Sequence, residues 1–312
     1  MTEISPLIIV GFGLGVGILI GMTGIGGGSL MTPLLVLFVG TPPVTAVGTD
    51  LAYGAVTKTV GGWKHWRQKT VDFKLSMWMA LGSVPAAIGG VYVIGILQRE
   101  LGEEQFNSTM LYLLAGAILF TGAVTLIRAI FLKKLIAMER DSFEMSTANK
   151  VTAALIGLTV GFVLGITSAG SGSLIALALI MVFRLTPHKV VGTDVFHAAI
   201  LLWAAGLAHI VAGNVDFVLA GTILVGSVPG VWIGSHLSVR LPAGTLRTVL
   251  GVVLIGAGLG LASKAGAPIP PFVIGIVPLV LAVIILIDRF RNRVSRADAD
   301  TEAQEPPPRA AQ

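Results

Sequence analysis

The sequence predicts an all-α polytopic membrane protein built from two related halves. Of its 312 residues, 54% are hydrophobic and 12% are charged, and the mean hydropathy is +0.89. Soluble domains, by contrast, carry about 25% charged residues. Apolar stretches of helical length recur along the chain, and one set of motifs occurs twice in the same order. We therefore expect two inverted-topology repeats of about five transmembrane segments, followed by one extra C-terminal helix.

The most informative stretch is a glycine run, Gly24-Ile25-Gly26-Gly27-Gly28-Ser29, set between two apolar segments. Glycine destabilises a helix interior by roughly 1 kcal/mol relative to alanine, so the run predicts an opened backbone. Within a bilayer such backbone must be buried in protein or line water, because unpaired peptide groups facing lipid are unstable. The segment that follows, Ser29 to Val39, is too short to cross a core about 30 Å thick.

The glycine run and its neighbours recur at an offset of 144 residues. The second copy of the run reads Ser168-Ala169-Gly170-Ser171-Gly172-Ser173, with fewer glycines than the first. The other matched pairs are Gly13 with Gly157, Gly17 with Gly161, Pro43 with Pro187, Gly48-Thr49-Asp50 with Gly192-Thr193-Asp194, His65 with His209, Asp72 with Asp216, and Gly82 to Pro85 with Gly226 to Pro229. A fixed offset over so many motifs indicates an internal duplication.

These observations divide the chain into five regions. They are a first membrane repeat (1–131), a cytoplasmic linker (132–150), a second membrane repeat (151–262), an extra transmembrane helix (263–288) and a disordered cytoplasmic tail (289–312). The expected membrane segments are 6–22, 29–39, 43–63, 73–96, 109–131, 151–166, 173–183, 188–210, 217–237, 245–262 and 272–287. An odd number of segments in each repeat forces the two repeats into opposite orientations.

The charges of matched loops support that inversion. Lys64, Arg67, Lys69 and Lys74 of the first half correspond to the uncharged Ala208, Val211, Gly213 and Val218 of the second half. Conversely, Gly40, Val44 and Thr45 become Arg184, His188 and Lys189. Because basic residues favour cytoplasmic loops, we expect the amino terminus outside and the carboxyl terminus in the cytoplasm.

The sequence argues against several classes of function. The net charge is +5 and the pI is near 9.7, but the basic residues lie beside apolar spans, which argues against a nucleic-acid partner. There is no cysteine, no Walker lysine motif, no His-Glu-x-x-His and no Gly-x-Ser-x-Gly. We expect no enzyme activity, no metal and no cofactor.

The opened glycine runs are candidate anion sites, because their free N–H groups and the positive end of the following half-helix attract anions. The alternative is that the glycines serve only close packing between helices. The candidate substrate-binding residues are Gly26, Gly27, Gly28, Ser29 and Thr49 in the first half, and Gly170, Ser171, Gly172, Ser173 and Thr193 in the second half.

Asp50 and Asp194 are the candidate coupling residues, since an ionised carboxylate within a bilayer is unfavourable by about 2.5 kcal/mol or more. Alternatively, Thr49 and Thr193 begin helices and the aspartates lie in the first turn. His65 and His209 are further candidates for carrying a proton, or are simply interfacial. Lys58 either faces the same site as a counter-charge or snorkels toward the cytoplasmic interface.

The Gly-Ile-Gly-Gly-Gly-Ser-Leu run, the Gly-Thr-Asp-Leu motif after a proline turn, His65 before Val-Asp-Phe, and Gly-Ser-Val-Pro together resemble the TauE/SafE family of sulfite exporters and permeases. The resemblance covers roughly residues 7–262. It implies transport of small sulfur-containing anions, such as sulfite or organosulfonates, across the bacterial inner membrane. The altered second glycine run leaves open whether the two halves have equal roles.

The expected function is thus secondary-active transport, in the export direction, of a small sulfur oxyanion held between the two glycine runs. The alternatives are a passive channel for the same anions and a membrane enzyme or assembly factor that uses the same cavity. The expected partners are the anionic substrate and the lipid bilayer, and the glycine stripes also allow a homodimer.

Overall fold

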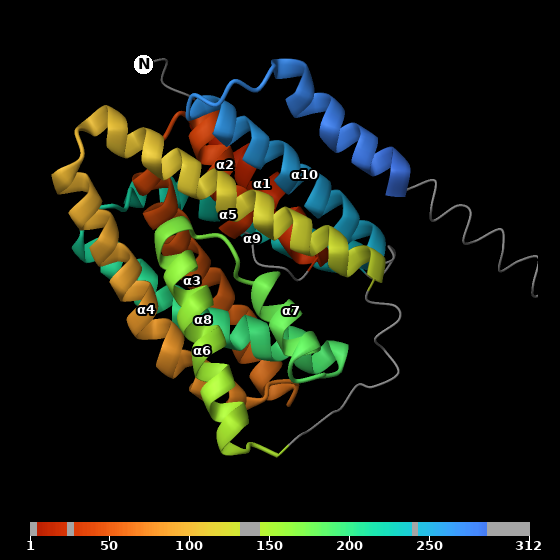
Figure 1. Cartoon of the computed structure of the whole chain (residues 1–312). Coiled ribbons are helices and arrows are strands. Elements are labelled where there is room, and N and C mark those ends of the chain that lie inside the picture. Colours follow the sequence, from red (N-terminus) through yellow and green to blue (C-terminus); the bar gives the residue numbers. More distant parts are fainter. Residues whose placement is uncertain (1–4, 24–27, 132–143, 239–242, 286–312) are drawn as a thin grey trace, which may run out of the picture.

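A computed structural model describes residues 5–23, 28–131, 144–238 and 243–285, and the regular elements there are helices (Figure 1). They are α1 (Pro6–Thr23), α2 (Gly28–Leu34), the π-helix η1 (Leu35–Val39), α3 (Pro43–Arg67), α4 (Phe73–Glu100), α5 (Glu103–Phe131), α6 (Thr147–Thr167), α7 (Leu174–Met181), α8 (Pro187–Val211), α9 (Phe217–Ser238), α10 (Ala243–Lys264) and a last helix at 271–285. Gly26, Gly27, residues 132–143 of the predicted linker and the predicted tail at 289–312 lie outside the described residues.

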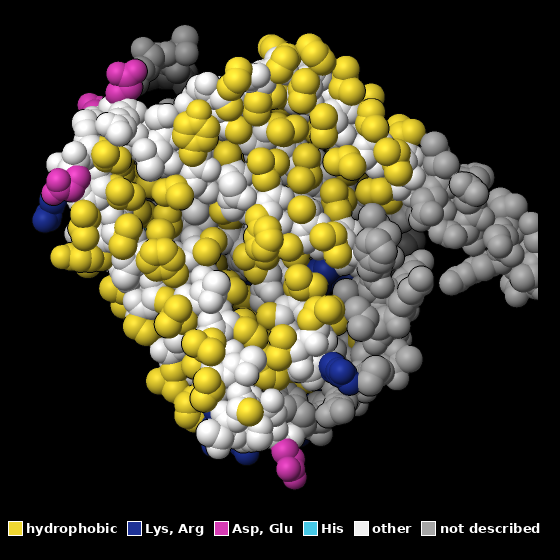
Figure 2. Space-filling view, in the orientation of Figure 1, with side chains coloured by type: hydrophobic (Ala, Val, Ile, Leu, Met, Phe, Trp, Pro, Cys, Tyr) yellow, Lys and Arg dark blue, Asp and Glu magenta, His cyan; other side chains and the backbone are white. Residues whose placement is uncertain are grey.

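The predicted class, an all-α polytopic membrane protein, is confirmed. Within the described residues, six helices are long and apolar enough to cross a membrane, namely α4, α5, α6, α8, α9 and α10. Shorter apolar helices occupy 6–22, 29–39 and 271–285. Figure 2 shows a face covered mostly by hydrophobic side chains, with acidic groups only near its ends. Such a surface suits contact with lipid rather than water.

Both helices that carry the candidate aspartates begin at a proline. Pro43 starts α3 and Pro187 starts α8, where the missing N–H of proline costs nothing. Asp50 and Asp194 therefore lie about two turns inside their helices. The alternative that helices begin at Thr49 and Thr193 is wrong. The basic stretch from Lys64 to Arg67 is also the last turn of α3 rather than a loop.

The two halves pack through equivalent pairs of helices, and each pair joins one helix of the first half to one of the second half. The first helix of each half packs along the fourth helix of the other half, so α1 contacts α9 and α6 contacts α4. The third helices, α3 and α8, pack on each other, and so do the fifth helices, α5 and α10 (Figure 1, yellow and blue). Because the first helix of each half packs against the other half, neither half encloses a hydrophobic core by itself.

Close approaches at glycines give the direction of each pairing. A Cβ added at Gly13 would lie 2.6 Å from the Ile223 carbonyl oxygen, and Gly234 farther along α9 approaches Ile18 farther along α1, so these helices are parallel. On α3 and α8 the order reverses. Gly54 meets Leu202 and Gly61 meets Val195, so the equivalent helices run antiparallel.

The antiparallel order also holds for α5 and α10, where Gly122 approaches Leu254 and Leu119 approaches Gly258. Two equivalent helices that pack side by side in opposite directions are related by an approximate two-fold axis perpendicular to them. An axis along the helices would have made them parallel.

The predicted small-residue stripes are used inside the molecule. Gly17 of α1 lies against the Ser227 backbone, and its counterpart Gly161 of α6 lies against the Ser83 backbone. In both places a Cβ would come within 3.0 Å of main-chain atoms of the neighbouring helix. Close packing therefore explains these glycines, and the expected homodimer stays a prediction that they do not support.

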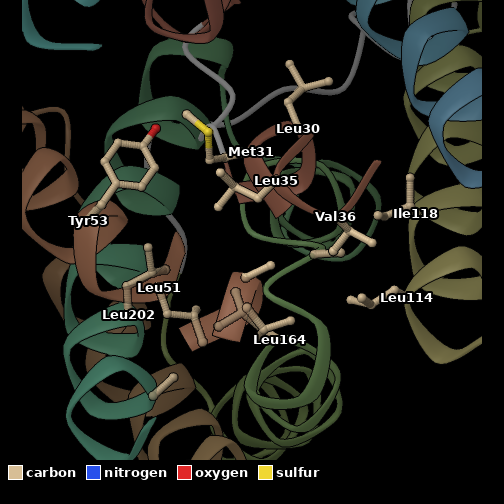
Figure 3. Packing of buried hydrophobic residues seen from close by; sticks show 14 of the residues in the cluster. Leu30, Met31, Leu35, Val36, Leu51, Tyr53, Leu114, Ile118, Leu164 and Leu202 are labelled. Atoms are coloured by element: carbon tan, nitrogen blue, oxygen red, sulfur yellow. The ribbon is translucent and has the colours of Figure 1, made fainter. Parts of the chain in front are cut away.

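The broken segment of the first half lies at the centre of the hydrophobic core (Figure 3). Leu30, Met31, Leu35 and Val36 of α2 and η1 are almost fully buried. Figure 3 shows them between Leu51, Tyr53 and Leu202 on one side and Leu114 and Ile118 on the other. The start of this half-helix is thus held deep inside the protein, as expected for opened backbone in a membrane.

Candidate functional site

The second glycine run has the opened backbone that its sequence predicts. Helix α6 ends at Thr167, and Ser168 follows in the left-handed conformation with φ 55°. Gly170 and Gly172 have φ values of 108° and 92°, which side chains rarely adopt. Helix α7 begins at Leu174. The run is buried, so its peptide groups face protein rather than lipid.

The two broken segments meet inside the molecule. The Gly170 N–H approaches the Ser29 Oγ, which accepts at 3.5 Å, and Ser29 is 3% exposed. The Ser168 hydroxyl crosses to the first half and donates to Asp50 Oδ2 at 2.9 Å. The predicted approach of the two glycine-run segments is therefore present at Ser29 and Gly170.

Asp50 of α3 is surrounded by hydroxyl groups. Its Oδ2 accepts hydrogen bonds from Thr32 Oγ1 at 2.6 Å and from Ser168 Oγ at 2.9 Å. The side chain is fully buried, and its Oδ1 has no hydrogen-bond partner within the described residues. The group thus joins α3 to α2 and to the opened backbone of the other half.

Asp194 of α8 occupies the matched position but has different neighbours. Its Oδ1 accepts a hydrogen bond from the Gly172 main-chain N–H at 3.2 Å. The charges that act on it are those of Lys58 and Arg128, both of which come from the first half. Lys58 is 8% exposed and Arg128 is 3% exposed. Because Lys58 is buried and its charge acts on Asp194, the structure favours its role as a counter-charge over snorkelling to the interface.

The difference between the two carboxylates follows from three substitutions between the repeats. Thr32, which donates to Asp50, corresponds to Ala176, and Ser168 corresponds to Gly24. Lys58 corresponds to Leu202. Asp194 therefore lacks the two hydroxyl donors that Asp50 has, and a buried basic side chain acts on it instead. The two halves are thus chemically unequal.

Arg128, in the last turn of α5, is a candidate site residue that the sequence analysis did not single out. One guanidinium nitrogen donates to the carbonyl oxygens of Gly172 and Ser173, each at 3.2 Å. The neighbouring Thr125 hydroxyl lies 2.9 Å from Ser173 Oγ. Arg128 looked like a span-end arginine because only the fold brings α5 onto the second glycine run. Its position within an apolar stretch was the available signal.

The predicted threonines connect the two halves. Thr49 Oγ1 accepts from the Asp216 N–H at 3.0 Å, and Thr193 Oγ1 accepts from the Asp72 N–H at 2.9 Å. These peptide groups lie just before the first turns of α9 and α4. The two bonds are equivalent by the repeat, and their contribution to substrate binding stays a prediction.

The hydrogen bonds of His65 and His209 go to groups other than the two aspartates. His65 Nδ1 lies 3.0 Å from Thr70 Oγ1, in the turn after α3. The buried His209 bonds the Gly165 carbonyl oxygen through Nε2 at 2.9 Å and the Asn214 side-chain amide through Nδ1 at 3.2 Å. Both ring nitrogens of His209 are thus occupied. A role for either histidine as a proton carrier stays a prediction.

His197 does not pair with Asp194, although the two share α8. Its Nε2 lies 2.9 Å from Ser83 Oγ of α4, across the interface between the halves. Within the part of the chain that the structure describes, no group of three or more histidines, cysteines or acidic residues gathers as metal ligands would.

Comparison with known proteins identifies the family. The model of the sulfite exporter TauE/SafE family matches residues 9–261 of the chain. The chain belongs to the TauE/SafE family. It is 41% identical over 253 residues to the "Probable membrane transporter protein YjnA" of Bacillus subtilis, covering 81% of this chain and 98% of that protein. No solved structure matches.

More distant TauE/SafE relatives have the same kind of name. The chain is 28% identical to the "Probable membrane transporter protein YdhB" of Bacillus subtilis, over 78% of this chain and 94% of that protein. It is 27% identical to a "Probable membrane transporter protein" of Xylella fastidiosa, over 83% and 95%. Together with the apolar helices, these matches identify a multi-pass membrane transporter.

Proposed function

We propose that this TauE/SafE member is a secondary-active transporter that exports small sulfur oxyanions, such as sulfite or organosulfonates, across the bacterial inner membrane. The observation that carries the proposal is the buried positive charge of Lys58 and Arg128 at the second opened glycine run. Buried cations near irregular backbone are unfavourable unless a function retains them. Together they match a small anion with several acceptor oxygens.

The site suits an oxyanion that must be released again. Its donors are the Gly172 N–H and the buried basic side chains of Lys58 and Arg128. Neutral donors orient the oxygens of a ligand without adding charge. One carboxylate, Asp194, offsets part of the positive charge, which keeps binding moderate. In this proposal Ser29 and Gly170 contribute where the two halves meet.

Alternating access in this proposal arises from rocking one repeat against the other. The antiparallel packing of α3 with α8 and of α5 with α10 supports two repeats of opposite orientation in the membrane. We place the amino terminus outside and the carboxyl terminus in the cytoplasm. The exposed Trp63 and Trp66, with Arg67 and Lys69 around a surface cleft of about 500 Å³, suit a cytoplasmic membrane interface.

Asp50 and Asp194 are the proposed coupling groups. Both are buried, and each lies where the opened backbone of a half meets α3 or α8. A carboxylate in such a place changes its interactions when it gains or loses a proton, and so links proton movement to the arrangement of the halves.

The test is anion flux in liposomes that contain only the purified protein. Sulfite uptake is measured with and without an imposed pH gradient, with sulfate and sulfoacetate as competitors. Accumulation of sulfite against its gradient is the expected result. Flux that only equilibrates would instead indicate a passive channel, and absence of flux for all three anions would overturn the substrate assignment.

A further inference from the structure

We infer that the Asp194 carboxylate is a built-in substitute for the substrate: it occupies an oxyanion site formed by Lys58, Arg128 and the Gly172 N–H, and an incoming oxyanion displaces it. The inference rests on the proposed function for its role in transport. The site itself, and the competition within it, follow from contacts between described residues.

Arg128 supplies the first sign of an incompletely filled site. The side chain is 3% exposed, yet its Nε has no hydrogen-bond partner within the described residues. A buried donor without an acceptor is unfavourable, and more so when the donor group is charged. The contacts of the guanidinium to Gly172 and Ser173 fix it beside the glycine run. An oxyanion oxygen at Nε would satisfy the remaining donor.

The charge around Asp194 supplies the second sign. Lys58 and Arg128 both act on this single carboxylate, and the charge of Arg247 on α10 acts on Arg128. Buried basic side chains therefore outnumber buried acidic ones at this place. An anion of small size corrects that imbalance, and a second carboxylate is not among the groups that act on Asp194.

Asp194 makes the contact that an oxyanion would make. Its Oδ1 accepts the N–H of Gly172, whose φ of 92° belongs to the opened backbone. Main-chain N–H groups of such backbone are common partners of sulfate and phosphate oxygens. The carboxylate thus imitates an oxyanion in shape and charge. Because both compete for the same donors, binding of one must release the other.

Asp50 provides an internal comparison. It lies at the matched position of α3, but hydroxyl groups surround it and no cation is among the groups that act on it. The oxyanion site therefore belongs to the second half alone. The second glycine run also differs from the first in sequence, since Ser171 adds a hydroxyl group where the first copy has Gly27.

The experiment is calorimetric titration of the purified full-length protein in detergent with sodium sulfite and sodium sulfate, with sodium chloride as the ionic-strength control. Asp194→Asn keeps the size of the side chain but removes its charge, so we expect at least a tenfold lower Kd for an oxyanion. Arg128→Lys keeps the charge but lacks the Nε–H, and we expect at least a tenfold higher Kd. Glu100→Gln removes a carboxylate charge at an exposed position at the end of α4, and this control should change Kd less than threefold.

The inference is overturned if Asp194→Asn binds no more tightly than wild type, or if Arg128→Lys binds as wild type does. Absence of oxyanion binding by every variant also overturns it. Thermal unfolding of each variant checks that a weakened Kd is not due to misfolding. Failure of the proposed function is distinct, because wild-type protein that binds as expected but moves no anion in liposomes would reject transport and leave the site intact.

Discussion

Asp50 and Asp194 show how much one matched residue depends on its neighbours. Both are buried aspartates at the same position of equivalent helices. Asp50 accepts two hydroxyl hydrogen bonds, whereas Asp194 accepts one main-chain N–H beside two cations. We therefore expect removal of their charges to have different effects.

Asp50→Asn should change the pH dependence of transport more than Lys58→Ala does. An asparagine cannot exchange a proton, so a step linked to protonation of Asp50 becomes insensitive to pH. Lys58→Ala should instead lower the apparent affinity for the anion. The measurement is the initial rate of sulfite flux in liposomes between about pH 5 and about pH 9, a range that includes neutral pH. Superimposable pH profiles for wild type and Asp50→Asn would reject the coupling role.

Thr49→Val should destabilise the protein by about 0.5–1.5 kcal/mol, because the hydrogen bond from the Asp216 N–H to the buried Thr49 hydroxyl is lost. Valine has a similar shape, so packing changes little. The readout is thermal unfolding in detergent. Thr222→Val is the matched control, since that hydroxyl is exposed and bonds only its own helix. Equal unfolding temperatures for both variants would contradict the structural role of Thr49.

At the scale of elements, glycine determines which helices can approach each other. Gly82 of α4 faces the Ala154 carbonyl of α6, and its counterpart Gly226 of α9 faces the Val10 carbonyl of α1. The stripes on α1 and α6 therefore meet matching glycines on α9 and α4. The four helices form two equivalent pairs whose backbones nearly touch.

Gly82→Ala should strongly reduce the yield of folded protein, since its Cβ would overlap the backbone of α6. Gly89→Ala lies on the same helix with nothing within 4 Å of the added Cβ. That change should be neutral or stabilise by up to ~1 kcal/mol, because alanine favours helix. Gel filtration of both variants measures the difference. A monodisperse, wild-type yield of Gly82→Ala would contradict the observed packing.

Over the whole molecule, the packing of helices between the halves makes the two halves interdependent. Each half packs its first helix against the other half, and the antiparallel pairs α3 with α8 and α5 with α10 also join the two halves. The oxyanion site is likewise built from both halves, since Lys58 and Arg128 come from the first half and Asp194 comes from the second half. A relative movement of the halves would therefore open or close the site directly.

Single cysteines at matched positions test the orientation of the halves. The native chain has no cysteine, so each probe is the only thiol. Gln68→Cys follows α3 and Ala212→Cys follows α8, and both positions are exposed. A membrane-impermeant maleimide added to intact cells should label only Ala212→Cys. Labelling of both or neither would mean that the repeats have the same orientation.

The sequence by itself determined the class, the duplication and the family. Composition and apolar runs suffice for an all-α membrane protein, because the bilayer allows few other structures. The spans at 6–22 and 217–237 nearly match α1 and α9, since proline and charge mark their ends. The aspartates were identified because a charge in an apolar repeat is conspicuous.

Only the tertiary structure decided which residues surround each aspartate. Arg128 is far from Asp194 in sequence, and its charge acts on Asp194 because α5 of one half packs onto the broken segment of the other. The charge of Lys58 likewise acts on Asp194 because α3 packs on α8. The sequence near each residue does not specify such pairings, because they depend on how all the helices pack together. The inequality of the two halves is therefore a tertiary property.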